Sequence, residues 1–419
     1  MASGGQWGLT DGMTSRPLLR TSLVAAAAGV LVVALTLLPQ DATSSPGAAT
    51  DQVGTWGTAA DATSLALADQ TVRNIVRTSV GGTNLRVSLS NAFGSRAVTF
   101  DSVWAGTAGA GAAVVAGTNR RVTFSGSTSV TVPPGAEVLS DPLPGEVPAL
   151  STLAVSIHVV GDAGTVSGHR LAHQTSWVST PGDHAQDESG TAYATPTTSS
   201  AWVEALVVEA PEQVDTVVAF GDSITDGDRS TTGANRRWPD LLAERILQQP
   251  APTHLGVMNA GISGNRLLND GSGQSAQARF DRDVLAQPDV RTAVVMEGVN
   301  DLRWEIATTP ADLITAYRQL VARGHARGVC VVGGTITPWE GGSRWSPAKD
   351  EIREAVNAWI RTSGEFDAVV DFDAAVRDQQ RPSRMLPAHD SGDHLHPGDT
   401  GYAAMAAAVD LRDLECRRP

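Results

Sequence analysis

TVVAFGDSITDG occupies residues 216–227, and the interpretation of the whole chain starts from it. Its first residues form a short apolar run typical of a buried strand, and Gly221 allows a sharp backbone turn where that run ends. Ser223 therefore lies just beyond the carboxyl end of a strand, which is where open α/β sheets bind their ligands. Taken alone, the segment also fits an ordinary helix start, because Asp and Ser are common N-caps.

Downstream of this segment, apolar β-like runs alternate with segments of helical periodicity. Two of these segments, Trp238–Leu247 and Asp312–Arg327, repeat apolar residues along one face. Pro239, Pro310 and Pro347 stand where helices are expected to begin, a position that tolerates proline. This alternation predicts a mostly parallel sheet covered by helices on both faces. The expected strands are Val214–Phe220, Gly256–Ala260, Thr292–Glu297, Val329–Thr335 and Ala368–Phe372.

Upstream, hydrophobic and polar residues alternate at the period of a β-strand, as in Leu153–Val159. Turn residues such as Pro133-Pro134-Gly135 separate these runs. We therefore expect a β-sandwich or jelly-roll accessory domain over residues 51–210, followed by an α/β domain over residues 211–419. The β domain could bind glycans or could cover and shape the cleft of the α/β domain.

Length and charge narrow the classes of protein to consider. A chain of 419 residues is too long for one average domain. With 31 basic and 45 acidic residues, the formal net charge is −14, which argues against a nucleic-acid partner. Hydrophobic residues make up 41% of the chain, enough to form a substantial core.

The N-terminus has the pattern of an export signal. Arg16 and Arg20 precede an uncharged apolar run of 18 residues, Thr21–Leu38, which Pro39 and small residues follow. A run of this length can also span a bilayer as an uncleaved anchor. Residues 1–50 are thus expected to be a signal peptide or membrane anchor plus linker. The folded part is expected outside the cytoplasm, either secreted or anchored.

The chain has two cysteines, Cys330 and Cys416. Export would permit a disulfide between them. Cys330 nevertheless lies in an apolar strand-like run, VCVVGG, where a buried free thiol is the ordinary finding. We expect a free thiol at Cys330, with a disulfide as the open alternative.

Four separate strand ends or loops of the α/β half carry the residue types that an acyl-transfer site needs. Ser223 follows the first expected strand, and Asn259-Ala260-Gly261 ends the second. Gly298-Val299-Asn300-Asp301 follows the third, and Asp393-His394-Leu395-His396 precedes the last expected helix. Each block alone is weak, because Asn, Asp and Gly are common in ordinary turns.

In order and position, the four blocks resemble those of the SGNH, or GDSL, hydrolase family. The segments NAGISGNR and GDHLHPGDTGY fit the same family pattern, and the resemblance extends over about Val214 to Leu411. It implies a flavodoxin-like three-layer α/β/α domain with a five-stranded sheet. It also implies a serine esterase that needs no cofactor and no metal.

The resemblance assigns a role to each of three side chains. Ser223 would be the nucleophile, His396 the general base, and Asp393 the group that orients the imidazole. His396 is preferred to His394 because the family spacing is Asp-x-x-His. For the oxyanion, the resemblance points to the backbone N–H groups of Ser223 and Gly261 and the side-chain amide of Asn300.

The segment His389–Asp399, HDSGDHLHPGD, also invites a metal hypothesis, since its His and Asp side chains could supply nitrogen and oxygen ligands. The chain has no HExxH-like helix, and the serine hypothesis explains more blocks. Trp304 and Trp339 follow the third and fourth expected strands and could shape a substrate pocket, although core packing is the commoner fate of tryptophan.

These features predict an exported serine esterase acting on acetylated carbohydrate or lipid esters, with membrane contact only through an uncleaved N-terminal anchor. An acyltransferase would share the triad and differ only in its acceptor. A non-catalytic glycan-binding surface protein would lack a triad member, and none is missing here.

Overall fold

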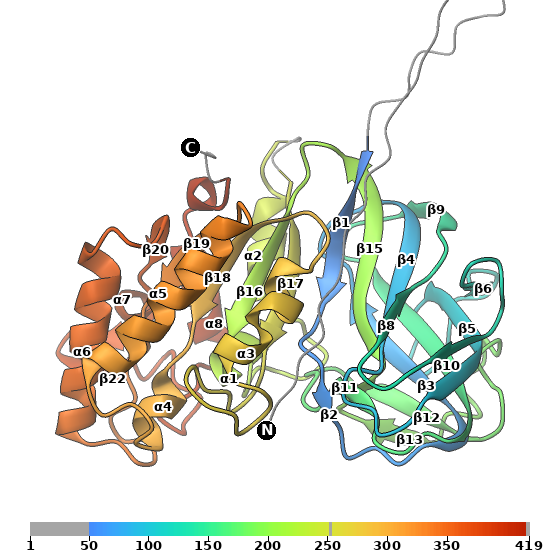
Figure 1. The fold of residues 1–419 in the computed structure, drawn as a ribbon, viewed down its shortest axis with the longest axis horizontal. Coiled ribbons are helices and arrows are strands. Elements are labelled where there is room, and N and C mark those ends of the chain that lie inside the picture. Colours follow the sequence, from blue (N-terminus) through green and yellow to red (C-terminus); the bar gives the residue numbers. More distant parts are fainter. Residues whose placement is uncertain (1–49, 251–253, 416–419) are drawn as a thin grey trace, which may run out of the picture. The chain divides into compact units, whose positions relative to one another are not determined.

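The structure, a computed structural model, describes residues 50–250 and 254–415 (Figure 1). These residues belong to one compact unit. The expected export segment lies outside the described residues. Within the two described ranges, no helix is long and apolar enough to cross a membrane.

The C-terminal half contains a five-stranded sheet in the order β17-β16-β18-β19-β20, and all of its strand pairs are parallel. Numbered along the chain, this order is 2-1-3-4-5, the flavodoxin-like arrangement. The predicted α/β fold is confirmed, and each strand lies within a few residues of its predicted position. The strand bounds are β16 Thr216–Gly221, β17 Gly256–Gly261, β18 Val290–Met296, β19 Cys330–Gly334 and β20 Ala368–Val370.

Helices cover both faces of this sheet. Pro239, Pro310 and Pro347 each lie in the first turn of a helix, as predicted. The helices are α1 Ser223–Asp226, α2 Trp238–Ile246, α3 Ala276–Phe280, α4 Val299–Arg303, α5 Pro310–Ala326, α6 Pro347–Thr362, α7 Phe372–Val376 and α8 Asp399–Ala408. A π-helical turn, Asp281–Leu285, continues α3, a 3₁₀ turn spans Leu411–Leu414, and a short hairpin joins β21 Arg377–Asp378 to β22 Arg381–Met385.

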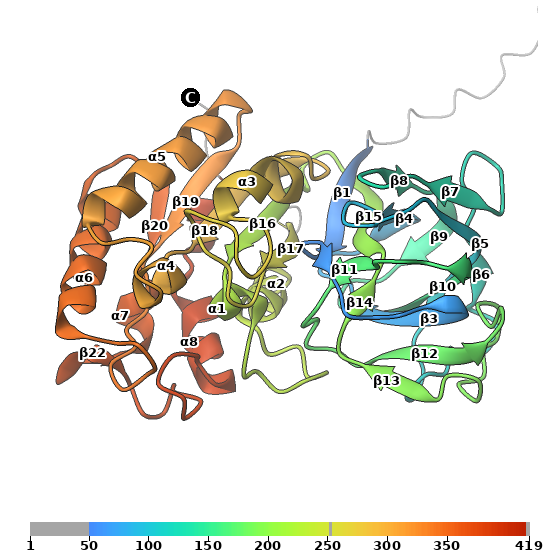
Figure 2. The ribbon, with the colours of Figure 1, turned by 60° about the horizontal axis from the view of Figure 1, so that its bottom comes forward.

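Alternation along β16 explains the two helical layers. Val218 and Phe220 share a core with α3, α5 and α6, whereas Val217 and Ala219 share one with α2, α7 and α8. Figure 2 shows the sheet between these layers. Because successive side chains of a strand point to opposite faces, a fully apolar strand must be covered on both sides.

Residues 50–211 form the β-rich half, and its core lies between two antiparallel sheets. The predicted β-rich architecture is therefore confirmed, while the jelly-roll connectivity stays a prediction. The strands are β1 Thr50–Gly57, β2 Asp61–Ala62, β3 Ala68–Arg77, β4 Gly82–Ser90, β5 Val98–Thr107, β6 Arg120–Arg121, β7 Val130–Val132, β8 Glu137–Leu139, β9 Leu143–Val147, β10 Thr152–Asp162, β11 Ser167–His169, β12 Ser176–Pro181, β13 Thr195–Thr197, β14 Ser200–Ala201 and β15 Val203–Pro211.

The two halves meet where β1 packs against β17 (Figure 1). The Gly54 N–H donates to the Thr216 hydroxyl at 2.9 Å. A Cβ added to Gly256 would lie 2.1 Å from the Gly54 carbonyl oxygen. Glycine at position 256 is therefore what allows the two backbones to approach this closely.

The expectation of a free thiol at Cys330 is wrong, because Cys330 is disulfide-bonded in the structure. Its strand, β19, is buried as predicted. Apolar surroundings suit a half-cystine as well as a thiol, so the local sequence could not discriminate between them.

Gly256→Ala should destabilise the protein by about 2–3 kcal/mol, because the new methyl group would overlap backbone that cannot swing aside. The free energy of unfolding from denaturant titration would measure this change. Gly398→Ala is the control, since a Cβ there would have no neighbour closer than 3.7 Å. Equal stability of the two variants would contradict the close approach of β1 to β17.

Candidate active site

The turn after β16 places Ser223 at the start of α1. The Asp222 carboxylate caps this helix by accepting the Ile224 N–H at 3.0 Å. A Cβ added to Gly221 would lie 2.3 Å from the Thr225 hydroxyl and 2.5 Å from the Met296 carbonyl oxygen, so the sharp turn requires glycine. Burial raises the pKa of Asp222 to about 6. The first helical N–H, that of Ser223, has no acceptor within α1.

Three of the predicted side chains come together in one hydrogen-bonded line. His396 Nε2 lies 2.9 Å from Ser223 Oγ, and His396 Nδ1 lies 2.7 Å from Asp393 Oδ2. Burial raises the pKa of Asp393, but hydrogen bonds from His396 outweigh it and hold that pKa below its ordinary value. Because the carboxylate is ionised, Nδ1 donates to it and Nε2 is left to accept the serine proton.

The neighbouring loop residues are placed differently. Arg229 Nε donates to Asp393 Oδ2 at 3.2 Å and is largely exposed. His394 Nδ1 instead contacts Asp390 Oδ2 at 2.5 Å, so it is not part of the line that contains Ser223. Within residues 50–250 and 254–415, no group of three His, Cys, Asp or Glu side chains is arranged to hold a metal ion.

Asn300, in α4, has its amide fixed by two hydrogen bonds. Its Oδ1 accepts from Arg303 Nη1 at 2.9 Å, and its Nδ2 donates to the Asn265 carbonyl oxygen at 2.9 Å. These contacts determine which end of the amide is the donor and leave one N–H for a further acceptor. The predicted role of Asn300 as an oxyanion donor fits this geometry.

The geometry does not support the predicted role of Gly261. Its N–H donates to Asn259 Oδ1 at 2.9 Å, so this donor is already used. Gly261 instead allows β17 to lie against α1, since a Cβ there would be 2.1 Å from the Asp226 nitrogen.

Gly264, the second glycine of NAGISGNR, is better placed to donate. Its φ is +82°, in the region that favours glycine. Among the described residues its N–H has no acceptor. It lies between Ser263, whose N–H donates to Asp226 Oδ2 at 2.8 Å, and Asn265, whose carbonyl oxygen accepts from Asn300.

His169, at the end of β11, joins the β-rich half to this turn. Its Nε2 lies 2.9 Å from Asp226 Oδ1, and its Nδ1 lies 2.8 Å from the Ala59 carbonyl oxygen. Both ring nitrogens face acceptors, an arrangement that favours the doubly protonated, charged ring. Burial lowers the pKa of His169, but Asp226 outweighs it and the net shift is upward from 6.5. The sequence carried no signal for this pair, which spans 57 positions.

Arg279, in α3, is fully buried beneath the turn. Its guanidinium donates to groups at the carboxyl ends of three adjacent strands and to two further side chains. The acceptors are the Gly221 carbonyl oxygen at 2.8 Å, the Ala260 carbonyl oxygen at 2.7 Å, Glu297 Oε1 at 3.2 Å, Asn265 Oδ1 at 3.0 Å and Asp283 Oδ2 at 3.0 Å. Sequence analysis missed this residue, because an arginine in a short helix gives no sign of burial.

The two candidate tryptophans differ. Trp339 is fully buried in the core shared with α5 and α6. Trp304, directly after α4, is 44% exposed. Only Trp304 is therefore available to contact a substrate.

Comparison with known proteins supports this description of the fold. Residues 219–404 match the model of the GDSL-like lipase/acylhydrolase family. No curated protein matches the chain significantly.

Several solved structures resemble about half of the chain. A protein assigned to the lipolytic G-D-S-L family of Desulfitobacterium hafniense is 22% identical over 46% of this chain and 96% of its own, with a TM-score of 0.37. Axe2, an acetylxylan esterase from Geobacillus stearothermophilus, is 22% identical over 48% of this chain and 94% of its own, with a TM-score of 0.37.

His169→Gln should destabilise the protein by about 3 kcal/mol near pH 6, because the buried Asp226 carboxylate would lose its closest cationic partner and keep only His173, 3.7 Å from its Oδ1. The pKa of His169 is raised above 6.5, so its contribution is complete below that pH and is lost as the pH rises through the raised value. Burial raises the pKa of Asp226, but His169 and His173 outweigh it and hold that pKa below 3.8, so Asp226 stays charged in the wild type throughout this window. Denaturant titrations from pH 5 to pH 9 would measure the difference between wild type and variant.

His173 and Arg237 also interact with Asp226, Asp228 acts on His173, and all three residues are present in both proteins. His325→Gln is the control, because His325 also contacts a carboxylate, Asp367 at 2.8 Å, but is 46% exposed. A loss at His169→Gln that does not change with pH would contradict a charged ring.

Proposed function

Because residues 219–404 form a GDSL-like lipase/acylhydrolase domain, and thus a carboxylic ester hydrolase, we propose that the protein cleaves carboxylic esters through an acyl-enzyme on Ser223. The observation that carries this proposal is the 2.9 Å contact between Ser223 Oγ and His396 Nε2, with Asp393 bound to the other ring nitrogen.

The first half-reaction forms the acyl-enzyme. Ser223 Oγ attacks the ester carbonyl carbon while His396 Nε2 takes the hydroxyl proton. The Asp393 carboxylate stabilises the imidazolium that results. The tetrahedral intermediate then collapses, the bond to the leaving alkoxide breaks, and His396 transfers its proton to that oxygen.

The second half-reaction releases the acid. His396, again neutral, takes a proton from water as the water oxygen attacks the acyl carbonyl carbon. Collapse of the second tetrahedral intermediate breaks the bond to Ser223 Oγ, which regains its proton from the imidazolium. Serine and histidine return to their starting states.

Three donors are available to the oxyanion in both half-reactions. They are the N–H of Ser223 at the start of α1, the N–H of Gly264 and the remaining N–H of the Asn300 amide. All three are held before substrate arrives, because Asp222, Asp226 and Arg303 fix the segments that carry them. Donors that need no rearrangement contribute most to lowering the barrier.

We propose that this chemistry takes place outside the cytoplasm, on acetylated carbohydrate or lipid esters. The support for the location is the apolar run Thr21–Leu38 behind Arg16 and Arg20. The direct contact of His169 with Asp226 supports a role of the β-rich half in shaping the site.

Ser223→Ala should lower kcat/KM for 4-nitrophenyl acetate by at least about 10³-fold, because no other group can form the acyl-enzyme. Labelling by a fluorophosphonate probe should disappear in the same variant. Ser127→Ala, which changes an exposed serine of the β-rich half, is the control. If the Ser223 variant keeps wild-type activity, the assignment of the nucleophile is wrong.

Asn300→Ala should lower kcat by about 10² to 10³-fold and change KM little, because the lost donor acts on the transition state. Steady-state kinetics with the same ester would measure both constants. Circular dichroism melting of the variant separates this loss from unfolding. A change confined to KM would exclude Asn300 as an oxyanion donor.

A further inference from the structure

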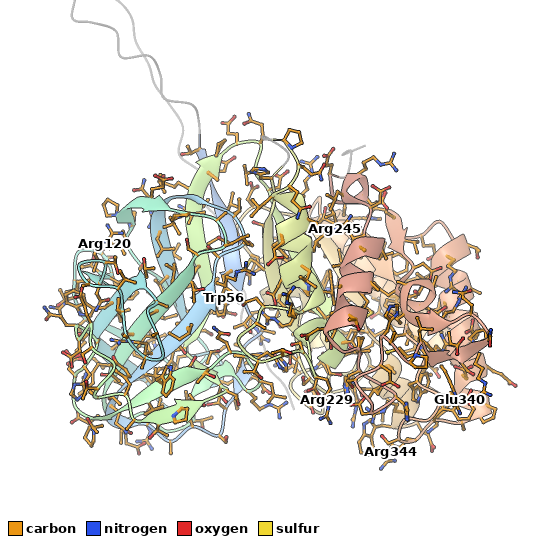
Figure 3. The ribbon with its side chains drawn as sticks, turned by 180° about the vertical axis from the view of Figure 1, so that it is seen from behind. Trp56, Arg120, Arg229, Arg245, Glu340 and Arg344 are labelled. Atoms are coloured by element: carbon orange, nitrogen blue, oxygen red, sulfur yellow. The ribbon has the colours of Figure 1, made fainter. Side chains whose placement is uncertain are left out.

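Three arginines surround the exposed Trp304 beside the proposed oxyanion site. Arg266 follows β17, Arg303 ends α4, and Arg344 lies in the loop between β19 and α6. The guanidinium carbon of Arg344 lies 3.8 Å from the centre of the Trp304 ring, and that of Arg266 lies 5.6 Å from it. We refer to Arg266, Arg303 and Arg344 as the arginine cluster. Figure 3 shows Arg344 and Arg229 at the same edge of the α/β half.

A chain of contacts joins the arginine cluster to Asn300. Arg303 donates from Nη1 to Asn300 Oδ1 at 2.9 Å and from Nη2 to Ser343 Oγ at 2.6 Å. Ser343 directly precedes Arg344. On the other side, Asn300 Nδ2 donates to the carbonyl oxygen of Asn265, which directly precedes Arg266. The cluster therefore borders the atoms that would hold the ester carbonyl.

The arginine cluster forms no close ion pair with the described part of the protein, although Asp301 acts on Arg266, and Asp222 and Asp393 act on Arg303, at longer range. None of the three guanidiniums lies within 4.0 Å of a carboxylate among the described residues. Arg266 Nε is buried without a hydrogen-bond partner. The nearby carboxylates have other contacts: Asp301 accepts the N–H groups of Leu267 and Leu268, and Glu305 pairs with Lys349 at 3.0 Å.

Stacking on an aromatic ring holds a guanidinium by its face and leaves its in-plane N–H groups free to donate. A carboxylate partner from the protein would use those donors, whereas Trp304 does not. The fork of N–H groups matches the two oxygens of a carboxylate. In a chain of net charge −14, long-range electrostatics disfavour an anion, so an anion would bind here only through the local cluster.

From this geometry we propose that the active site takes esters that carry a carboxylate, which Arg344 and Arg266 of the arginine cluster bind, while Arg303 holds Asn300 and Ser343. Among the acetylated carbohydrate and lipid esters proposed above, acylated acidic sugars carry such a carboxylate and are the substrate class that we infer. The inference rests on the proposed ester hydrolysis and makes its substrate class more specific.

The surroundings favour a soluble acidic sugar over a membrane lipid. Trp304 is the one exposed large hydrophobic side chain of the described α/β half, since Val115, Leu139, Val160 and Leu171 all lie in the β-rich half. Insertion into a lipid surface requires a continuous apolar face, which a single ring does not provide.

Matched pairs of esters test the inference. In the first pair the leaving group differs: 4-acetoxybenzoate carries a carboxylate there, and its methyl ester does not. In the second pair the acyl group differs: 4-nitrophenyl hydrogen succinate carries a carboxylate there, and its methyl ester does not. The ratio of kcat/KM for the charged ester to that for the neutral ester should fall about tenfold in Arg266→Gln/Arg344→Gln, for at least one pair, because two charge-assisted contacts are lost.

Two further variants make this result interpretable. Arg344→Gln alone, at an exposed position, should lower the ratio by a smaller factor and keeps the test valid if the double variant folds poorly. Arg327→Gln is the control and should leave the ratio unchanged. Arg327 is also an exposed arginine without a carboxylate partner in the described ranges, but it lies after α5, at the opposite end of β19 from the site. A ratio that is the same in wild type and both cluster variants overturns the inference.

Binding to the full-length Ser223→Ala protein provides a readout that does not depend on activity. Calorimetry should detect trigalacturonate but not neutral maltotriose, and the binding should be lost when Arg266→Gln/Arg344→Gln is added. If the wild-type protein hydrolyses none of the esters but the Ser223→Ala protein binds trigalacturonate, the proposed reaction is rejected and the anion site is kept. Equal binding of both sugars, or cluster-dependent binding of anionic phospholipid vesicles in place of trigalacturonate, would overturn the substrate class.

Discussion

The buried guanidinium of Arg279 is the contact on which the site depends. It donates to carbonyl oxygens that end β16 and β17 and to Glu297 just after β18, so one side chain ties together the strand ends that lead to Ser223, Gly264 and Asn300. A parallel sheet leaves such terminal carbonyls without partners, and burying them unsatisfied would be costly. Arg279 therefore provides hydrogen-bond donors to these carbonyl oxygens and also sets the spacing of the groups that would act on an ester.

Asp226 links the two halves of the molecule, as Arg279 links the strand ends. One carboxylate oxygen accepts from His169 of the β-rich half, and the other accepts from the turn that carries Gly264. Since Asp226 lies one helical turn after Ser223, the proposed nucleophile and the proposed oxyanion donor Gly264 are both held by this carboxylate. The β-rich half is thus part of the framework of the site, through a charged pair that low dielectric surroundings make strong and that neither half could satisfy alone.

Local patterns in the sequence predicted much of the fold and much of the hydrogen-bonded arrangement of Ser223, His396 and Asp393. Strand and helix positions follow from periodicity, and the placement of Ser223 follows from one strand and one turn. Asp393 and His396 lie three residues apart on one loop, so their contact is nearly fixed by spacing. The family resemblance pointed to the N–H of Gly261 as an oxyanion donor, but NAGISGNR contains two glycines, and the sequence does not show that Asn259 already accepts the N–H of the first. It also failed at Cys330, where apolar neighbours suit a thiol and a disulfide equally.

The sequence by itself determined the alternation of strands and helices, the residues available for a serine triad and the segment that carries each of them. Only the tertiary structure decided which distant groups surround the site: Arg279 beneath the strand ends, His169 from the other half, and the arginine cluster around Trp304. The physical reason is the distance along the chain over which each kind of interaction acts. Periodicity and turn chemistry act over a few neighbouring residues, whereas the pairing of a buried charge is settled by groups that meet only after the chain has folded.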